Sequence, residues 1–352
     1  MRIAQVAPLY ESVPPATYGG TERVVSYLRE ELVRQGHDVT LFASGDSTTA
    51  ARLRPVCPRA LRLDSDCIDK VTPQVLQLEM VLQEADRFDM VHFHTGFLHF
   101  PAVRRLLRAQ LTTIHGRMDL PELQTFLESF QDMPVVSISD AQRGPVPFAN
   151  WQATVHNALP VDLYPWCEEP DGYFAFLGRI SPEKRVDHAI EIARRVGVPL
   201  KIAAKVDEVD RLYFEDQIQP LLAQPGIEYL GEIGQADKAA FLGGARALLF
   251  PIDWPEPFGM VMIEAMACGT PTVALRRGSV PEVMEDGVTG YVVDDLEDAV
   301  EAARLVTWID RKRCREVFER RFGAPRMAHE YVAVYEALLD RCERPEAVLA
   351  HP

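Results

Sequence analysis

The chain has 352 residues, of which 47% are hydrophobic and 25% charged, as in a globular protein. This length exceeds what one ordinary hydrophobic core accommodates, so we expect two domains. The formal net charge of -15 argues against nucleic acid as a partner and against electrostatic attachment to an anionic membrane.

The first half of the chain alternates short apolar strands with helices. In chain order, strands are expected at 3–7, 39–43, 90–93, 111–114 and 135–138, and helices at 22–34 and 75–85. This alternation is typical of a parallel sheet covered by helices on both faces. We therefore predict a first, Rossmann-like domain that spans residues 1–160.

The alternation resumes after a proline-rich, polar interval at 159–172, which indicates a domain boundary. The expected elements are strands at 173–177, 200–203, 227–230, 247–250 and 272–275, with a helix at 187–195. These place a second Rossmann-like domain at 161–325. Residues 326–352 are predicted to form an amphipathic helix that packs back toward the first domain, followed by a frayed tail at 344–352.

The predicted fold class is α/β, with two doubly wound parallel sheets that face each other across a cleft. Ligands of such sheets bind beyond the carboxyl ends of the strands. The stretch WPEPFGMVMIEAMACGTPTVA, which begins at residue 254, places Glu256 before a helix that starts near Gly259, and Glu264 inside that apolar helix. The free amides of a helix start favour an anion, so this spacing suits a ligand with hydroxyl groups at both ends and an anion in the middle.

Two motifs of the first domain also follow strands. Gly19 and Gly20, in PPATYGGTERVV, allow backbone amides to approach an anionic ligand at a helix start, although a flexible turn is the simpler alternative. The motif lacks the G-x-G-x-x-G spacing of nicotinamide-cofactor proteins. His115, in TTIHGRMD, lies at the carboxyl end of an inner strand, where a functional role competes with a purely structural one.

Cations occupy the corresponding positions of the second domain. Arg179, in FAFLGRISPEKRVD, follows the first strand, and Lys184 lies at the next helix start, where the helix dipole disfavours a cation. A bound diphosphate would account for both residues. The alternative is a solvated surface on which Glu183 is the ionic partner. Lys205, in IAAKVD, lies at a neighbouring strand tip and is a weaker candidate.

Four motifs in this order, YGGTE, TIHG, GRISPEK and EPFGMVMIEAMACGTPTVA, make the chain resemble the family 4 retaining glycosyltransferases of GT-B fold. The resemblance runs over nearly the whole chain. It implies that the first domain shapes the acceptor side and that the second binds a nucleotide diphosphate sugar. It further implies hexose transfer to an acceptor hydroxyl, with UDP-glucose as the first candidate donor and GDP-mannose as the second.

The resemblance also implies residue roles. Glu264 would bind the ribose hydroxyls of the donor, and Arg179 and Lys184 would neutralise the leaving diphosphate. Glu256, beside the donor sugar, and His115, near its reacting face, are the catalytic candidates. The other substrate-binding candidates are backbone and loop positions: Gly19, Gly20, Lys205, Phe258, Gly259, Met260, Val261, and Glu232 and Ile233 of the base-contacting loop YLGEIGQ.

No acidic pair is placed like the D-x-D of metal-dependent transferases, and His92 and His94 alternate along a strand without an evident third ligand. We therefore expect neither a metal nor a cofactor, because the nucleotide sugar is a co-substrate. Two alternatives stay open: a nucleotide-sugar epimerase of the same two-domain fold and a non-catalytic nucleotide-sugar-binding protein. The acceptor is unknown, and a basic helix face leaves peripheral membrane association open: Arg104, Arg105 and Arg108.

The cysteines and the N-terminal segment indicate the compartment. Six scattered cysteines without a C-x-x-C pair favour reduced thiols, and thus a cytoplasmic location, over a disulfide framework or a zinc site. Residues 1–7 resemble a buried strand and are too short for a signal sequence. No apolar run reaches membrane-spanning length, so we expect no integral membrane segment.

Overall fold

The computed structural model describes residues 1–16, 19–107 and 109–343. These residues form two compact units. Unit 1 contains residues 1–138 and 143–156 and the C-terminal segment from Ala324, and unit 2 contains 139–142 and 157–323. Apart from the short segment 139–142, the chain passes from unit 1 to unit 2 at residue 157 and returns to unit 1 at Ala324. The predicted tail at 344–352 and Arg108 lie outside the described residues.

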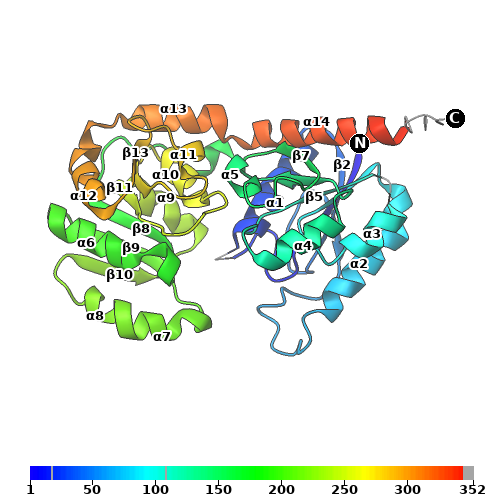
Figure 1. Cartoon of the computed structure of the whole chain (residues 1–352), viewed down its shortest axis with the longest axis horizontal. Helices are drawn as coiled ribbons and strands as arrows, with labels where there is room; N and C mark the ends of the chain where they lie inside the picture. The colour runs from blue at the N-terminus through cyan, green and yellow to red at the C-terminus, as the bar shows by residue number, and fades with distance from the viewer. Residues whose placement is uncertain (17–18, 108, 344–352) are drawn as a thin grey trace. The chain divides into compact units, whose positions relative to one another are not determined.

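Unit 1 is built on a sheet of seven parallel strands in the order β3-β2-β1-β4-β5-β6-β7 (Figure 1). Their bounds are β1 Arg2–Val6, β2 Asp38–Ala43, β3 Arg52–Pro55, β4 Met90–Phe93, β5 Gln110–Thr113, β6 Val135–Ser137 and β7 Trp151–Thr154. The edge strands β3 and β7 were not predicted, because they bury little apolar surface.

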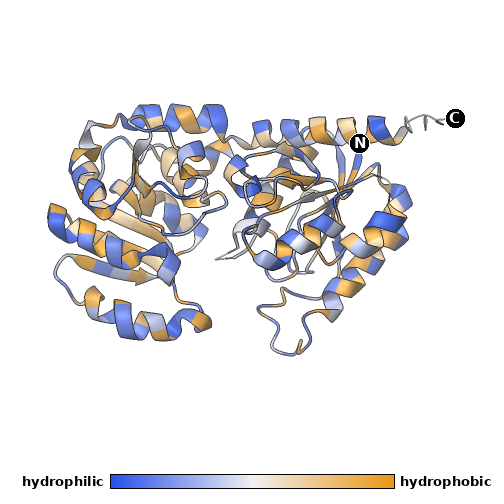
Figure 2. Ribbon diagram, in the orientation of Figure 1, coloured by the Kyte–Doolittle hydropathy of each residue, from blue (hydrophilic) through white to orange (hydrophobic). Residues whose placement is uncertain are grey.

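Helices cover the sheet of unit 1. The first helix is α1 and the last is α14, which packs against α1 and so completes this unit with the end of the chain. The helix bounds are α1 Gly20–Arg34, α2 Thr72–Glu84, α3 Phe100–Leu106, α4 Pro121–Ser129 and α14 Ala324–Glu343, while the short α5, Asp140–Arg143, lies where the chain passes between the units. Strands are predominantly apolar, whereas most helices carry one apolar and one polar face (Figure 2). This pattern confirms the predicted α/β layers.

Unit 2 repeats the plan with six parallel strands in the order β10-β9-β8-β11-β12-β13. The strands are β8 Tyr173–Arg179, β9 Leu200–Lys205, β10 Ile227–Gly231, β11 Ala245–Phe250, β12 Thr272–Leu275 and β13 Gly290–Val293. The main helices are α6 Val186–Val196, α9 Gln235–Gly243, α10 Met260–Ala267, α12 Leu296–Leu305 and α13 Arg311–Arg321. The edge strand β13 was not predicted.

Each sheet has one point at which the strand order changes direction. In unit 1 it lies between β1 and β4, and in unit 2 between β8 and β11. Crevices for ligands form at the carboxyl ends of the strands at such switch points. The segments that follow these four strands are therefore the places where a site is expected in each unit.

Candidate active site

The switch point of unit 2 is bordered by the segments that follow β8 and β11. After β8 the chain turns through Pro182–Lys184, a short 3-10 helix, and after β11 it runs as a loop to the start of α10. A backbone hydrogen bond joins the two segments: the amide of Asp253 donates to the carbonyl of Glu183 over 2.9 Å. Side chains from both strand exits are thus held on one edge of the sheet.

Lys184 and Glu256 meet at this edge. The Lys184 ammonium donates a hydrogen bond to Glu256 Oε2, and Trp254 Nε1 donates to the same oxygen over 2.8 Å. The ammonium also lies 4.8 Å from the centroid of the Trp254 ring, within reach of a cation–π interaction. Glu256 Oε1 has no hydrogen-bond partner within the described part of the chain. That oxygen can therefore accept from a ligand hydroxyl.

The loop that carries Glu256 is fixed from behind by Gly278 and Ser279. Ser279 donates from its amide to the Glu256 carbonyl over 3.0 Å and from Oγ to the Phe258 carbonyl over 2.9 Å. At Gly278, whose φ is +50°, an added Cβ would lie 2.4 Å from both the amide nitrogen and the carbonyl oxygen of Glu256. Only glycine permits this approach. Sequence reasoning missed both residues, although a glycine just after strand β12 is a usable signal.

The start of α10 is open to an anion. Gly259, with φ of +77°, is the N-cap, and no side chain among the described residues caps this helix. The first amides of a helix have no partner within it, so those of Met260 and Val261 have none inside α10. Phe258 is 2% exposed, and its ring packs edge-on to Phe322. The ring is therefore part of the core, and only the Phe258 backbone can face a ligand.

Glu264 lies further along α10 and is 3% exposed. Its Oε1 accepts hydrogen bonds from Tyr164 Oη over 2.9 Å and from Lys238 Nζ over 3.0 Å, so its charge is compensated. Oε2 has no protein partner among the residues that the structure places. Tyr164 and Lys238 were not predicted, and no sequence spacing relates them to Glu264.

Arg179 and Lys205 lie side by side, because they are register partners at the ends of β8 and β9. Asp207 binds both: its carboxylate is 2.8 Å from Lys205 Nζ and 3.4 Å from an Arg179 nitrogen. Burial opposes ionisation of Asp207, but the hydrogen bonds and charges of Lys205 and Arg179 hold its pKa below the ordinary value. Arg179 also pairs with Glu183 over 2.5 Å. The ion pair that the sequence offered as the alternative for Arg179 is therefore present, and a diphosphate would have to share this guanidinium with the carboxylates.

Glu232 and Ile233 follow β10, the edge strand on the β9 side of the sheet. Glu232 is exposed and Ile233 is partly buried. Two strands, β8 and β9, thus lie between β10 and the switch point. Like Lys205, these two residues lie at the carboxyl ends of the strands. They follow β10, whereas Glu256 follows β11, on the other side of the switch point.

The predicted residues of unit 1 lie beyond β1 and β5. Gly19, with φ of +147°, is the N-cap of α1, and an added Cβ would lie 2.8 Å from Pro15. No atom of the described residues lies within 4 Å of a Cβ added at Gly20. His115 follows β5 and is partly buried, and burial lowers its pKa to about 4. Its imidazole is therefore neutral at physiological pH.

His92 and His94 bond to neutral polar side chains of unit 1. His92 lies 2.8 Å from Thr113 Oγ1 and 2.7 Å from Tyr335 Oη, and His94 lies 2.7 Å from Gln5 Oε1. Across the described residues, no group of three or more His, Cys, Asp and Glu side chains is arranged to hold a metal ion. The independence from metal that the sequence suggested stays a prediction.

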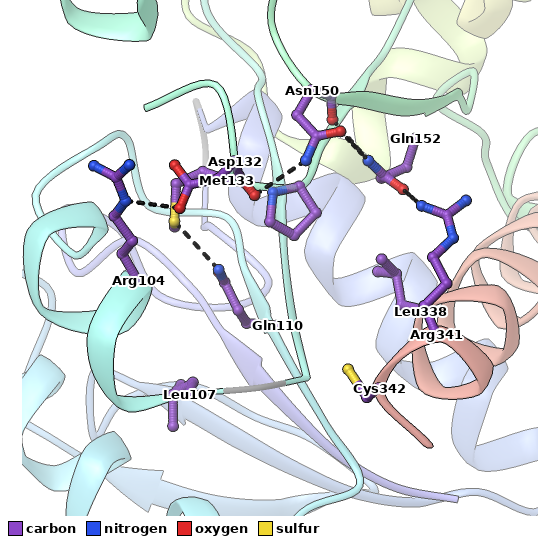
Figure 3. Close-up of a pocket in the computed structure, with 11 residues that line it drawn as sticks. Arg104, Leu107, Gln110, Asp132, Met133, Asn150, Gln152, Leu338, Arg341 and Cys342 are labelled. Atoms are coloured by element: carbon purple, nitrogen blue, oxygen red, sulfur yellow. Dashed lines mark hydrogen bonds and ion pairs between the residues drawn. The ribbon is translucent and has the colours of Figure 1, made fainter. Parts of the chain in front are cut away.

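A cavity of about 260 Å³ in unit 1 lies away from these residues. It is lined by residues at the start of β5 and near the end of α14, among them Gln110 and Arg341 (Figure 3). His115 follows the opposite end of β5. The cavity therefore belongs to the amino ends of the strands and contains none of the predicted site residues.

Two family models match the chain, one in each half. The model described as Glycosyl transferases group 1 matches residues 167–320, and the model described as Glycosyltransferase Family 4 matches residues 18–145. With the two parallel sheets, these matches define the protein as a glycosyltransferase of GT-B fold. The chain belongs to glycosyltransferase family 4, as the sequence motifs predicted.

Relatives and solved structures extend over the same length. Phosphatidyl-myo-inositol mannosyltransferase of Mycobacterium tuberculosis is 26% identical over 96% of this chain and 97% of its own. AviGT4, a glycosyltransferase of avilamycin A biosynthesis, superposes with a TM-score of 0.75 at 23% identity over 97% and 98% of the two chains. HepE of Anabaena, in complex with UDP and glucose, superposes with a TM-score of 0.71 at 18% identity over 96% and 100%. None of the helices in the described ranges is long and apolar enough to cross a bilayer.

Proposed function

We propose that this protein is a retaining hexosyltransferase that transfers a sugar from a nucleotide diphosphate sugar to an acceptor hydroxyl without a metal ion. The observation that carries the proposal is the arrangement at the switch point of unit 2. There, the Lys184–Glu256 pair lies on the loop segments beside the uncapped start of α10, and Glu264 lies further along the same helix. A cation, helix amides and two carboxylates in this order match the parts of a nucleotide diphosphate sugar.

The diphosphate is assigned to the cationic part of this arrangement. Lys184 supplies a point charge, and the amides of Met260 and Val261 add the partial positive charge of a helix start. Arg179 and Lys205 contribute once the phosphate oxygens replace part of their bonds to Asp207 and Glu183. Stabilising the charge that develops on the leaving group would supply most of the rate acceleration.

The two glutamates are assigned to the sugars at either end of the donor. Each has one oxygen engaged within the protein and one left without a partner among the described residues, Oε1 in Glu256 and Oε2 in Glu264. Glu256, with the amides near Phe258 and Gly259, would hold the hydroxyls of the transferred sugar. Glu264 would accept hydrogen bonds from the ribose hydroxyls, and Glu232 and Ile233 would contact the base.

In unit 1, the amides near Gly19 and Gly20 and the ring of His115 are assigned to the same reaction through the family resemblance. In the proposed mechanism, the bond between the anomeric carbon and the β-phosphate oxygen breaks first, and positive charge builds on the sugar. The acceptor oxygen then bonds to that carbon from the same face, and its proton passes to the departing phosphate. The configuration at the anomeric carbon is thereby retained.

UDP-glucose is the first candidate donor and GDP-mannose the second. The structural similarity to a protein crystallised with UDP and glucose supports the first, and the relative named as a mannosyltransferase supports the second. We place the reaction in the cytoplasm, since none of the six cysteines, all within the described residues, forms a disulfide. The acceptor is a hydroxyl compound of unassigned class.

The test is to incubate the protein with each donor, with and without a mixture of sugar and lipid acceptors, and to follow the anomeric signals by NMR. The proposal predicts a glycosylated product with the anomeric configuration of the donor, and at most slow hydrolysis when no acceptor is present. Conversion of the donor to an epimer without acceptor would identify an epimerase. Binding of the donor without turnover in any mixture would identify a non-catalytic binding protein.

A further inference from the structure

Buried polar side chains of unit 1 form a hydrogen-bonded chain that ends on His115. Its members come from β1, β4, the residue that follows β4, β5 and the C-terminal helix α14, and each is at most 3% exposed. They are Gln5, His92, His94, Thr113, Tyr331 and Tyr335. Burying so many polar groups is costly unless each one is hydrogen-bonded. Each of these bonds needs one donor and one acceptor, so the choice of donor in one bond fixes the donor in the next.

The direction follows from Gln5. Its carbonyl oxygen Oε1 can only accept, so His94 Nε2, 2.7 Å away, must carry the proton that forms this bond. A neutral imidazole has one N–H, which leaves His94 Nδ1 as an acceptor. The ring nitrogen 3.0 Å from it is His115 Nε2, which must therefore carry the proton of that ring. His115 Nδ1 is left as the unprotonated nitrogen.

The Gln5 amide is placed with its nitrogen toward Tyr335 of α14 and its oxygen toward His94. Gln5 Nε2 donates to Tyr335 Oη over 3.1 Å, and Tyr335 Oη in turn donates to His92 Nδ1 over 2.7 Å. His92 then donates from Nε2 to Thr113 Oγ1 over 2.8 Å. Turning the Gln5 amide over would reverse every proton in this sequence, so the whole chain shares a single direction.

We propose that Gln5, His94 and Tyr335 are positioning residues that fix His115 as its Nε2–H tautomer. His115 then presents Nδ1 to a substrate hydroxyl as an acceptor and not as a donor. This inference rests on the proposed function in one respect, namely that His115 contacts the substrate. The C-terminal helix thereby acts on the predicted site of unit 1 through the hydroxyl of Tyr335.

The direct test is the tautomer itself, read by long-range ¹H–¹⁵N NMR on protein labelled at histidine, with His115 signals assigned from a His115→Gln spectrum. Wild type is expected to show the Nε2–H pattern for His115. Gln5→Leu removes the acceptor of His94 and is expected to convert His115 to a mixture of tautomers. Tyr335→Phe, a milder change that guards against misfolding, should shift His115 in the same direction, because the Gln5 amide loses its hydrogen bond to the Tyr335 hydroxyl.

His99→Gln is the matched control. His99 is as buried as His94, and it bonds to Thr112 over 2.8 Å. It is not a member of the hydrogen-bonded chain that leads to His115. This variant is expected to leave the His115 signals unchanged. In kinetics, Gln5→Leu and Tyr335→Phe are expected to lower kcat/KM about tenfold, whereas His99→Gln should leave it within about twofold.

An Nδ1–H pattern in wild type, or an unchanged tautomer in both Gln5→Leu and Tyr335→Phe, would overturn the inference whether or not the protein transfers sugar. The expected tautomers together with absence of turnover on every nucleotide sugar would instead support the positioning chain and contradict the proposed function. The two failures are therefore distinguishable.

Discussion

The ammonium group of Lys184 is held between the carboxylate of Glu256 and the ring face of Trp254, in unit 2. The side chains of Lys184 and Glu256 are 19% and 12% exposed, so the pair is largely screened from water. A cation kept in this way needs little rearrangement to receive a phosphate oxygen, and preorganisation of this kind is what stabilises a leaving group. The same contact fixes the carboxylate that we assign to the transferred sugar.

Replacing Lys184 with methionine is expected to lower kcat by about 10²–10³-fold, because the leaving diphosphate loses a preorganised charge. Steady-state kinetics with the preferred donor measure this effect. Lys201→Met is the control, since Lys201 lies on β9 of the same unit and pairs over 3.7 Å with the more exposed Glu228. Equal kcat values for both variants would contradict the role of Lys184.

Replacing Glu264 with glutamine is expected to raise the donor KM about tenfold, because one charged hydrogen-bond acceptor for the ribose is lost. Glu264→Ala should in addition lower the free energy of unfolding by about 3 kcal/mol, because Lys238 is left without its carboxylate. Urea denaturation measures this loss. The double variant with Lys238→Met should recover part of the stability, and a purely additive result would argue against the ion pair.

Replacing Gly278 with alanine tests the backbone contact behind Glu256. The new Cβ would meet backbone atoms of Glu256 at 2.4 Å, so the loop must move, and we expect activity to fall at least about tenfold. Gly287→Ala is the matched control, because Gly287 also has a positive φ, +73°, but no atom of the described residues lies within 4 Å of the added carbon. Both variants introduce backbone strain, and only Gly278→Ala should displace Glu256.

The fold followed from the sequence wherever strands were buried on both faces. Strands β4 and β12 have the predicted bounds, because all four residues of each are buried and three of the four are apolar. The edge strands β3, β7 and β13 were missed, because an edge strand has a neighbouring strand on one side only and its residues show a weaker hydrophobic pattern. The start of helix α10 was placed correctly near Gly259, which is its N-cap.

The placement of the candidate residues was predictable where they follow strand ends, and it was not predictable where distant segments converge. Lys184 and Glu256 were both selected from the sequence, but their contact depends on the register of β8 beside β11. Tyr164 and Lys238, which bond Glu264, come from segments that no spacing rule connects to it. The ion pairs of Arg179 with Glu183 and Asp207 likewise depend on how the chain leaves β8 and β9.

The stability of unit 1 should depend on pH through its buried histidines. Burial lowers the pKa of His115 to about 4, below its ordinary value near 6.5, so the unfolded chain binds more protons between these pH values. The free energy of unfolding should therefore rise with pH from about 4 to about 6.5 and be flat above. His115→Gln should reduce this slope by up to about 1.4 kcal/mol per pH unit. Urea titrations across this range that give identical slopes for both proteins would contradict this.

Removal of divalent ions tests the assignment of charge stabilisation to protein groups. We expect transfer activity in excess EDTA to equal that in Mg²⁺ or Mn²⁺ within about twofold, because Lys184, Arg179 and the start of α10 are assigned to the diphosphate. Activity assays after dialysis against the chelator provide the measurement. If activity were lost in EDTA and restored by Mg²⁺ or Mn²⁺, a metal ion would stabilise the charge on the diphosphate.

Calorimetric titration of wild type and of Lys184→Met with UDP and GDP measures whether unit 2 binds a nucleoside diphosphate through Lys184, as we propose. We predict that wild type binds at least one of the two and that the variant binds it at least about tenfold more weakly, with Lys201→Met unchanged. Binding of neither nucleotide at millimolar concentration, or equal affinity in wild type and Lys184→Met, would contradict the account.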